Sequence, residues 1–299
     1  MQYYSHGKLL LTGEYAVLDG ALSLAVPTAL GQRLGISPNG KTNLHWTSCD
    51  LHGNVWFENT LFEDKSADNV SVTLEKILST AGMLNPEFVS KLQGVDVRTD
   101  LEFERTWGLG SSSTLISNIA RWAGVDAYEL LFKSFGGSGY DIACAVHDTP
   151  VLYRLANGEP KAYPVDFSPE FINQIHFVHL NQKQNSKEGI ARYRAIRKSK
   201  KTLIDGITAI TEECIRTCSI SQFCELIDTH ETLVADYLQL PKVKELYFSD
   251  FEGSIKSLGA WGGDFVMAVS EREPAFVKHY FEDKGFATVV AYSEMIFQE

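Results

Sequence analysis

A glycine-rich turn that runs into a helix is the feature that most constrains this chain. Residues 107–114 read Trp-Gly-Leu-Gly-Ser-Ser-Ser-Thr, and apolar residues then recur at helical spacing, at Leu115, Ile116, Ile119 and Trp122. A glycine turn that opens a helix directs several backbone N–H groups and the positive end of the helix dipole at one point. That point suits a phosphate group, and serine hydroxyls can add donors or metal ligands. A serine-capped helix behind a flexible turn is the alternative interpretation.

Composition narrows the class of protein and its partners. The chain has 299 residues, 44% hydrophobic and 22% charged, which is long enough for two domains and typical of a globular protein. Its formal net charge of -11 argues against nucleic acid or an anionic membrane as a partner. An anionic small molecule must therefore be held by local donors, lysine or a metal ion. The odd number of cysteines, five, and the lack of a signal-peptide pattern favour a cytoplasmic protein.

The N-terminal segment combines a buried-strand pattern with two charged residues. Lys8 precedes three consecutive leucines, and Glu14 follows the glycine just after them. A lysine and a glutamate that border a buried strand are candidate site residues. Ordinary surface positions are the alternative, because charged residues are mostly exposed.

A match to the Walker A pattern occurs at residues 35–42, which read Gly-Ile-Ser-Pro-Asn-Gly-Lys-Thr. A true phosphate-binding loop of this kind follows a strand and opens a helix. Here a strand-like alternation follows from Asn43 to Ser48, and the central Pro-Asn-Gly is turn chemistry. We therefore predict a hairpin whose tip matches the pattern by chance.

A second glycine-rich stretch presents an aspartate. Residues 136–139 read Gly-Gly-Ser-Gly, and Asp141 follows before a run of small residues. Glycines allow the backbone to approach a ligand closely and hold Asp141 at a fixed place, whereas an N-cap aspartate is the structural alternative. Upstream, Asp126 and Glu129 have the spacing of a capping box.

The remaining pattern mixes helices and strands in both halves of the chain, which favours an α+β fold. We expect a helix over 70–81 that ends at Gly82, a strand over 94–103, and mostly helical structure over 202–258. The proline-containing segment 160–169 is the candidate domain boundary, and it divides the chain into 1–165 and 166–299.

Six basic residues gather between positions 192 and 201 of this acidic protein. A solvated helix face explains such a cluster, and capture of an anionic substrate is the alternative.

Three separated stretches together resemble one family. Residues 7–20, 108–112 and 259–264 resemble, in order, the three motifs of the GHMP kinase superfamily, which includes galactokinase, homoserine kinase, mevalonate kinase and phosphomevalonate kinase. The resemblance implies a two-domain α+β fold, with an N-terminal ATP-loop domain (1–165) and a ferredoxin-like C-terminal domain (166–299). It also implies ATP and Mg²⁺ as cofactors and a small-molecule substrate. Homodimers are common among such kinases, so a homodimer is one candidate assembly.

The mevalonate-pathway branch is the most similar one. Residues 137–143 and 262–264 resemble phosphomevalonate kinases, and mevalonate kinases usually have histidine in place of Tyr15. Residues 183–187 resemble a degraded substrate-loop signature, with Ser186 where threonine is usual. Trp261 stands where the family has glycine, and the proline usual before the ATP loop is missing. These departures leave open whether the acceptor is an alcohol or a phosphate.

The resemblance also implies roles for individual residues. Asp141 would accept the proton of the acceptor or orient it, Lys8 would stabilise the anion beside it, and Ser112 and Glu129 would reach Mg²⁺. The nucleotide would contact Gly108, Leu109, Gly110, Ser111, Ser112 and Ser113. The substrate would contact Glu14, Tyr15, Ser138, Lys183, Ser186, Gly262, Gly263 and Asp264.

Other functions within this resemblance stay open. One is a GHMP kinase for another metabolite, such as a sugar or homoserine. Another is a catalytically silent nucleotide-binding protein whose cleft is blocked by Trp261. A decarboxylase of mevalonate diphosphate is disfavoured, because that branch usually lacks the lysine present here as Lys8.

Overall fold

A computed structural model describes residues 1–63, 68–183 and 186–297. The chain forms two compact units, each built from segments that are not contiguous in sequence. The first unit comprises Met1–Gly7, Leu30–Arg105 and Leu109–Val146, and the second comprises Lys8–Ala29, Thr106–Gly108 and His147–Glu299. Strands β1 (Gln2–Leu10) and β2 (Ser23–Pro38) pair with each other and contribute residues to both units.

The units differ from the predicted division at residues 165 and 166. That position follows the hairpin of β6 (Val151–Ala156) and β7 (Glu159–Pro164), and β6 pairs with Ser23–Ala25 of β2. The hairpin and the segment 8–29 therefore belong to the second unit together with the C-terminal half. Strand pairing between distant segments, which no composition change marks, sets this division.

The sheet of the first unit contains β3 (Leu44–Cys49), β4 (Val55–Leu61) and β5 (Val95–Leu101), in the order β4-β3-β5-β2. The segment that matches the Walker A pattern ends β2 and turns into β3, and no helix follows it. The predicted hairpin is nevertheless wrong, because β5 lies between β2 and β3 and pairs with both, parallel to β3 and antiparallel to β2. Turn chemistry predicts where a chain reverses, not which strands pair.

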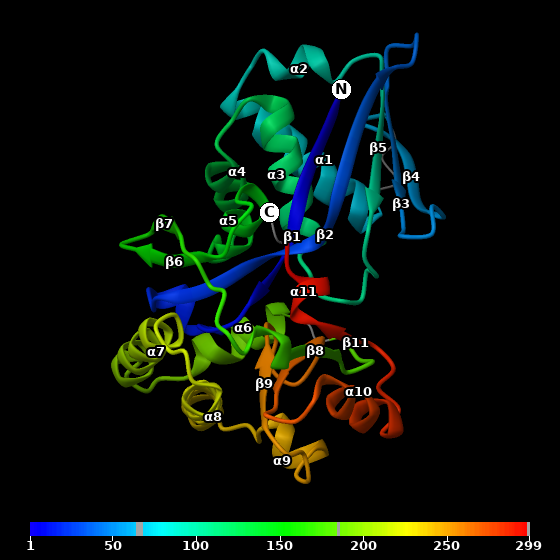
Figure 1. The fold of residues 1–299 in the computed structure, drawn as a ribbon. Coiled ribbons are helices and arrows are strands. Elements are labelled where there is room, and N and C mark those ends of the chain that lie inside the picture. The colour runs from blue at the N-terminus through cyan, green and yellow to red at the C-terminus, as the bar shows by residue number, and fades with distance from the viewer. Residues whose placement is uncertain (64–67, 184–185, 298–299) are drawn as a thin grey trace. The chain divides into compact units, whose positions relative to one another are not determined.

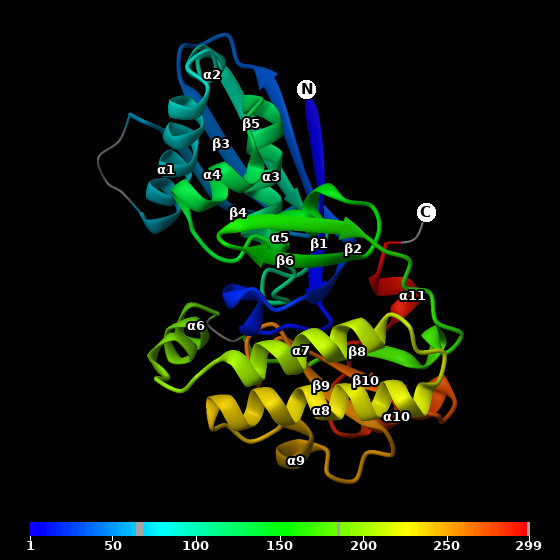
Figure 2. The same cartoon turned by 90° about the vertical axis from the view of Figure 1, so that its left-hand side faces the viewer.

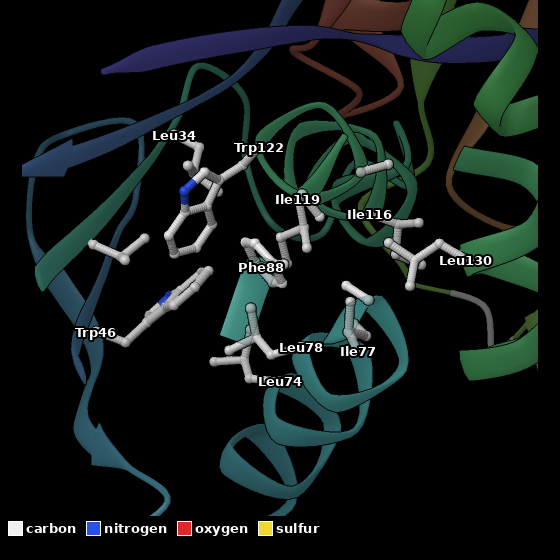
Figure 3. Close-up of a cluster of buried hydrophobic side chains, with 14 of the residues drawn as sticks. Leu34, Trp46, Leu74, Ile77, Leu78, Phe88, Ile116, Ile119, Trp122 and Leu130 are labelled. Carbon is white, nitrogen blue, oxygen red and sulfur yellow. The ribbon is translucent and has the colours of Figure 1, made fainter. Parts of the chain in front are cut away.

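Helices of the first unit pack on this sheet (Figure 1). They are α1 (Asn69–Leu84), α2 (Phe88–Lys91), α3 (Ser111–Ala123), α4 (Ala127–Ser134) and α5 (Tyr140–Val146). Figure 3 shows the hydrophobic core between them, where Trp46 and Leu34 of the strands meet Leu78, Ile119 and Trp122 of the helices.

Helix α1 continues past the predicted stop at Gly82 and ends at Leu84. Gly82 is buried inside the helix, and an added Cβ there would lie 3.0 Å from a methyl of Val89. The helix ends where Asn85 leaves the helical conformation ahead of Pro86.

The second unit contains a four-stranded antiparallel sheet in the order β11-β8-β10-β9. Its strands are β8 (Ile175–His179), β9 (Ser254–Leu258), β10 (Phe265–Val269) and β11 (Val289–Ala291). The segment 254–258, which we expected to be helical, is therefore a buried strand. Helices α6 (Ser186–Ala195), α7 (Lys201–Cys214), α8 (Ile220–Leu238) and α9 (Val243–Tyr247) connect β8 to β9, and α10 (Pro274–Asp283) connects β10 to β11.

This order of elements, with helices crossing between β8 and β9 and again between β10 and β11, is the ferredoxin-like arrangement. Figure 2 shows α7 and α8 lying side by side in this unit. Short 3₁₀ turns at Ala16–Asp19 and Ile172–Gln174 and a final helix α11 (Tyr292–Met295) complete the described elements. None of the helices in the described ranges is long and apolar enough to cross a membrane.

Candidate active site

The N-terminus of α3 carries no side-chain cap. Gly110 is the N-cap residue, in the left-handed conformation with φ 90°, and it makes no side-chain cap hydrogen bond. The Ser113 hydroxyl donates to the Gly110 carbonyl at 2.8 Å, and the Thr114 hydroxyl donates to Oε1 of Gln32 at 2.7 Å. The serine-capped alternative is therefore wrong. The N-cap residue therefore leaves the first N–H groups of the helix without a side-chain acceptor of its own, as a phosphate site requires.

The first glycine of the same loop lies against Asp264. Gly108 has φ 66°, and a Cβ at this position would lie 2.4 Å from Oδ2 of Asp264. The ring of the preceding Trp107 packs edge-on against Phe265, with the centroids 5.5 Å apart. Asp264 itself has a φ of 52°, which is unusual for a residue with a side chain. Two predicted site residues from distant motifs, Gly108 and Asp264, are thus in contact within the second unit.

Asp141 is the second residue of α5 and is half-buried. The preceding Gly139 has φ 92° and accepts hydrogen bonds from the amides of Ile142 and Ala143, so the glycine, and not the aspartate, begins this turn. The N-cap alternative for Asp141 is therefore wrong. Helix α5 packs against α3, and Ile142 belongs to the same core cluster as Ile116 and Ile119, while Ser138 is buried.

Glu14 lies in a buried cluster of charged and polar groups in the second unit. Its side chain is 1% exposed, and its Oε2 lies 2.6 Å from Nζ of Lys256 and 3.4 Å from Nε2 of His230. The Gly13 amide donates to Nε2 of His230 at 2.9 Å, so that imidazole is neutral. Direct contact between Glu14 and a substrate stays a prediction. What the structure places against its carboxylate is Lys256.

Burial controls the ionisation of this cluster. It raises the pKa of Glu14, against the opposing effect of the Lys256 ammonium, and it holds the pKa of His230 well below its usual range. It also raises the pKa of Glu231 to about 7. Glu231 accepts from the amide of Ser257 at 3.0 Å and from its hydroxyl at 2.7 Å.

A hydrogen bond connects the side chain of Tyr15 to the backbone of Trp261. The Trp261 amide donates to the Tyr15 hydroxyl at 2.9 Å, and Tyr15 stacks on Tyr193 with centroids 5.7 Å apart. Tyr15 has a φ of 60°, so a strained backbone places this ring. The indole of Trp261 is buried in the same apolar cluster as Tyr15 and donates from Nε1 to the carbonyl of Pro241 at 3.0 Å. Trp261 is therefore a core residue of the second unit.

The fold matches solved kinase structures along almost the whole chain. Streptococcus pneumoniae phosphomevalonate kinase, in complex with phosphomevalonate and AMPPNP, matches with a TM-score of 0.73 at 17% identity, covering 97% of this chain and 99% of that one. Methanococcus jannaschii mevalonate kinase matches with a TM-score of 0.70 at 15% identity, covering 100% and 98%. Lactococcus lactis galactokinase, complexed with galactose, matches with a TM-score of 0.69 at 14% identity, covering 99% and 93%. No protein-family model and no curated protein matches the sequence.

This chain has the GHMP kinase fold. The predicted fold class is confirmed, including the ferredoxin-like sheet. In this GHMP kinase fold, the loop 259–264 is bonded to Gln182, which directly precedes the predicted substrate segment 183–187. The side chain of Gln182 donates to the carbonyl of Gly262 at 2.9 Å, and the backbone carbonyl of Gln182 accepts from the amide of Asp264 at 3.0 Å. Within that segment, Lys183 and Ser186 are exposed. Residues 184–185 lie outside the described residues.

The basic cluster at residues 192–201 of this GHMP-fold chain has some members paired within the protein and others exposed on the surface. Lys200 pairs with Asp19 at 2.8 Å and lies over the ring of Tyr193 at 4.3 Å. Arg192, Arg194 and Arg197 are exposed on α6 and just beyond it. The structure thus assigns part of the cluster to the protein's own packing and leaves the three arginines on the surface.

The two predicted metal ligands differ in their surroundings. Ser112 is exposed in the first turn of α3, where its hydroxyl is accessible. The carboxylate of Glu129 is paired with Lys133 at 2.8 Å, while its amide donates to the N-cap residue Asp126 at 2.7 Å. The described residues contain no group of three or more histidine, cysteine or acidic side chains placed to hold a metal ion.

Sequence reasoning missed Lys256 and Glu231. A signal for Lys256 was present, because a single lysine interrupts the run Ser254–Leu258 directly before the glycine turn at 259. Expecting a helix there hid it, since a lysine on a helix is ordinarily exposed. Glu231 carries no comparable signal in its own neighbourhood.

Proposed function

We propose that this chain is an ATP-dependent kinase that transfers the γ-phosphoryl group of ATP to an alcohol or phosphate group of a small molecule, most specifically a substrate of the mevalonate pathway. The observation that carries the proposal is the start of α3. A left-handed glycine, which has no side chain to cap the helix, stands at its N-cap position, and the helix occurs within a fold shared with kinases. Phosphoryl transfer needs mainly alignment and charge neutralisation, which such a helix end supplies.

The nucleotide loop is proposed to act through its backbone. Residues 108–113 would hold the phosphates with amide groups, and Ser112 would hold Mg²⁺. When bound, Mg²⁺ would neutralise phosphate charge that the net charge of -11 otherwise opposes. The carboxylate of Glu129 is already paired with Lys133, so Ser112 is the stronger candidate.

Asp141 and Lys8 are the proposed catalytic residues. Asp141 would accept the hydroxyl proton of an alcohol acceptor or orient the acceptor, and Lys8 would stabilise the attacking anion. Lys8 is a half-buried residue of β1, and Asp141 is a half-buried residue of α5. Retention of both, together with Ser112, favours an active kinase over a silent binding protein. The burial of the Trp261 indole in the core also argues against a cleft blocked by this side chain.

The mevalonate-pathway assignment rests on motifs and neighbours together. The stretch 137–143 and the run 262–264 resemble phosphomevalonate kinases, and both mevalonate and phosphomevalonate kinases are among the structural neighbours. Galactokinase and a heptose phosphate kinase are neighbours as well, so the fold alone does not select the acceptor.

A coupled ADP-release assay tests the function directly. The purified chain is incubated with ATP, Mg²⁺ and, separately, mevalonate, its 5-phosphate, homoserine and galactose. We expect turnover with one of the two mevalonate-type acceptors and none without Mg²⁺. Turnover restricted to galactose or homoserine would replace the proposed substrate class. Nucleotide binding without turnover on any acceptor would favour a silent protein.

Substitution of Asp141 by asparagine distinguishes the two kinds of acceptor. An alcohol must lose a proton as it attacks, whereas a phosphate oxygen is already ionised near neutral pH. We expect Asp141→Asn to lower kcat by more than about 10³-fold if the acceptor is an alcohol, and only about 10-fold if it is a phosphate. Thermal unfolding of the variant serves as the control for folding. Full activity in a folded variant would remove Asp141 from the mechanism.

A further inference from the structure

Two buried connections join the segment Gly13–Tyr15 to the loop that begins at Gly259, all within the second unit. One is the hydrogen bond from the Trp261 amide to the hydroxyl of Tyr15. The other is the ion pair of Glu14 with Lys256, which lies three residues before Gly259. Both segments contain residues that we predict to contact substrate.

Lys256 is a buried charged residue, and its burial costs desolvation free energy. Its side chain is 0% exposed, and it stands in a strand whose five residues are all buried. A buried ion pair contributes little net stability, because desolvation offsets the attraction, and well-packed apolar residues of similar size are often as stable or more so. Stability alone therefore does not explain why this strand carries a lysine.

The groups around the ammonium identify its partner. Glu14 on the loop after β1 is the nearest carboxylate at 2.6 Å, and the Ser257 carbonyl accepts a hydrogen bond from Nζ at 2.9 Å. On α8, His230 is neutral and Glu231 is held by Ser257. On α7, the Cys214 thiol is buried, and burial raises its pKa to about 12, so it carries no charge. Glu14 is thus the anion that Lys256 fixes.

We propose that Lys256 is a positioning residue that fixes Glu14, and with it the backbone of residues 13–15, against the loop 259–264. Tyr15 follows Glu14 directly, and Asp264 at the end of that loop lies against Gly108 of the nucleotide loop. The pair therefore sets the relative position of three segments that carry predicted site residues. The expected effect on kcat rests on the proposed kinase function. The fixed position of residues 13–15 against the loop 259–264 does not depend on that function.

Alignment gives the expected size of the effect. A misplacement of about 1 Å in a catalytic site can lower turnover about 10²-fold. Loss of the pair should therefore reduce kcat, while the KM for ATP changes little, because the first turn of α3 is formed by other residues.

The central experiment separates positioning from stability. Lys256→Met leaves Glu14 buried without a partner and should be strongly destabilised, whereas the double variant Glu14→Gln/Lys256→Met removes both charges and should regain most of the parental Tm. We expect the double variant to keep a kcat at least about tenfold below the parent, with a KM for ATP within about twofold. Lys242→Met is the matched control, because Lys242 pairs with Glu245 on the surface of the same unit. A double variant with parental Tm and parental kcat would overturn the proposal.

A second variant covers the case in which the double variant does not fold. Glu14→Asp keeps the charge but shortens the side chain by one methylene, so the carboxylate no longer reaches Lys256 without movement of the loop. We expect a lower kcat and faster amide hydrogen exchange at residues 13–15 and 259–261. Parental kcat and parental exchange in this variant would contradict the positioning role.

Hydrogen exchange also separates the failure of this proposal from failure of the kinase assignment. If the parent turns over none of the acceptors, the proposed function is wrong, and the exchange measurement still decides the positioning role. Faster exchange at both segments in Glu14→Asp or in the double variant supports it. Unchanged exchange in a folded variant overturns it.

Discussion

Gly108 is the residue at which backbone conformation and packing both exclude a side chain. Its φ of 66° favours glycine, and its missing Cβ leaves room for the carboxylate of Asp264. The glycine is therefore required both by the turn of the loop and by the contact with the loop that ends at Asp264.

Gly108→Ala should destabilise the protein by more than the backbone effect alone. An alanine at positive φ costs about 1 kcal/mol of stability. In addition, its Cβ would lie 2.4 Å from Oδ2 of Asp264, so either the loop at Gly108 or the loop at Asp264 must move. Gly158→Ala is the matched control, since Gly158 has φ 83° and no atom within 4 Å of an added Cβ. Urea unfolding should show a larger loss for Gly108→Ala, and calorimetry should show weaker nucleotide binding only for that variant. Equal losses with unchanged binding would mean that the Asp264 contact is unimportant.

Glu231 makes the stability of the protein depend on pH. Its pKa is raised from an ordinary value of 4.5 to about 7, with burial as the largest cause. Between these values the folded protein holds a proton that the unfolded chain releases. The contribution of Glu231 to the free energy of unfolding therefore decreases as the pH rises from about 4.5 to about 7.

Glu231→Gln should remove this dependence. Glutamine keeps an oxygen that can accept from Ser257 and carries no charge, so the variant should match the parent near pH 5 and exceed its unfolding free energy by up to about 3 kcal/mol at pH 8. Urea unfolding at both pH values measures the difference. Glu225→Gln, an exposed position on the same helix, is the control. Parallel pH profiles for parent and Glu231→Gln would contradict the prediction.

At the scale of elements, α3 is oriented by both of its faces. Ile116, Ile119 and Trp122 are buried in the core of the first unit. Polar groups then set its rotation: the Ser5 hydroxyl contacts Ser117 at 3.0 Å and Asn118 at 2.9 Å, so the helix meets β1 through specific hydrogen bonds. The end of the helix that we propose to bind phosphate is thereby fixed relative to the strands.

Ile119→Ala tests how much the core contributes to holding α3. The side chain is fully buried, so its truncation should lower the free energy of unfolding by about 2–5 kcal/mol. Leu115→Ala on the same helix should cost less, because Leu115 is only partly buried at the edge of the cluster. Chemical denaturation compares the two variants. A smaller loss for Ile119→Ala than for Leu115→Ala would contradict the assigned core.

At the scale of the whole molecule, the second unit depends on an N-terminal segment. Residues 8–29 supply Glu14 to Lys256, the Gly13 amide to His230, and Tyr15 to the apolar cluster that contains Trp261. A C-terminal fragment lacks all three. An unpaired buried charge alone costs about 3–5 kcal/mol, which is a large part of the stability of an ordinary domain.

We therefore expect the fragment 166–299 not to fold by itself. Its far-UV circular dichroism should show no cooperative thermal transition, and its amide NMR signals should be poorly dispersed. Addition of a synthetic peptide of residues 8–29 should restore part of the structure. Cooperative unfolding of the isolated fragment without the peptide would show that the contacts of this segment are dispensable.

Local sequence patterns were sufficient to predict individual helices, strands and helix caps. Helical periodicity after the glycine turn predicted α3, alternation predicted β5, and Asp126 was predicted to cap α4, as the hydrogen bond from the Glu129 amide confirms. The kinase fold was predicted differently, from the resemblance of three separated motifs to the GHMP kinases. The individual helices, strands and caps depend on residues within a few positions of one another.

Tertiary structure alone decided which distant segments meet. Insertion of β5 between β2 and β3, the membership of residues 8–29 in the second unit, and the pairing of Glu14 with Lys256 each join segments separated by tens to hundreds of residues. Such pairings depend on strand register and on the burial of charge, which no local pattern records. For the same reason Trp261, a departure from the family pattern that suggested a blocked site, proved to be a core residue once its neighbours in space were known.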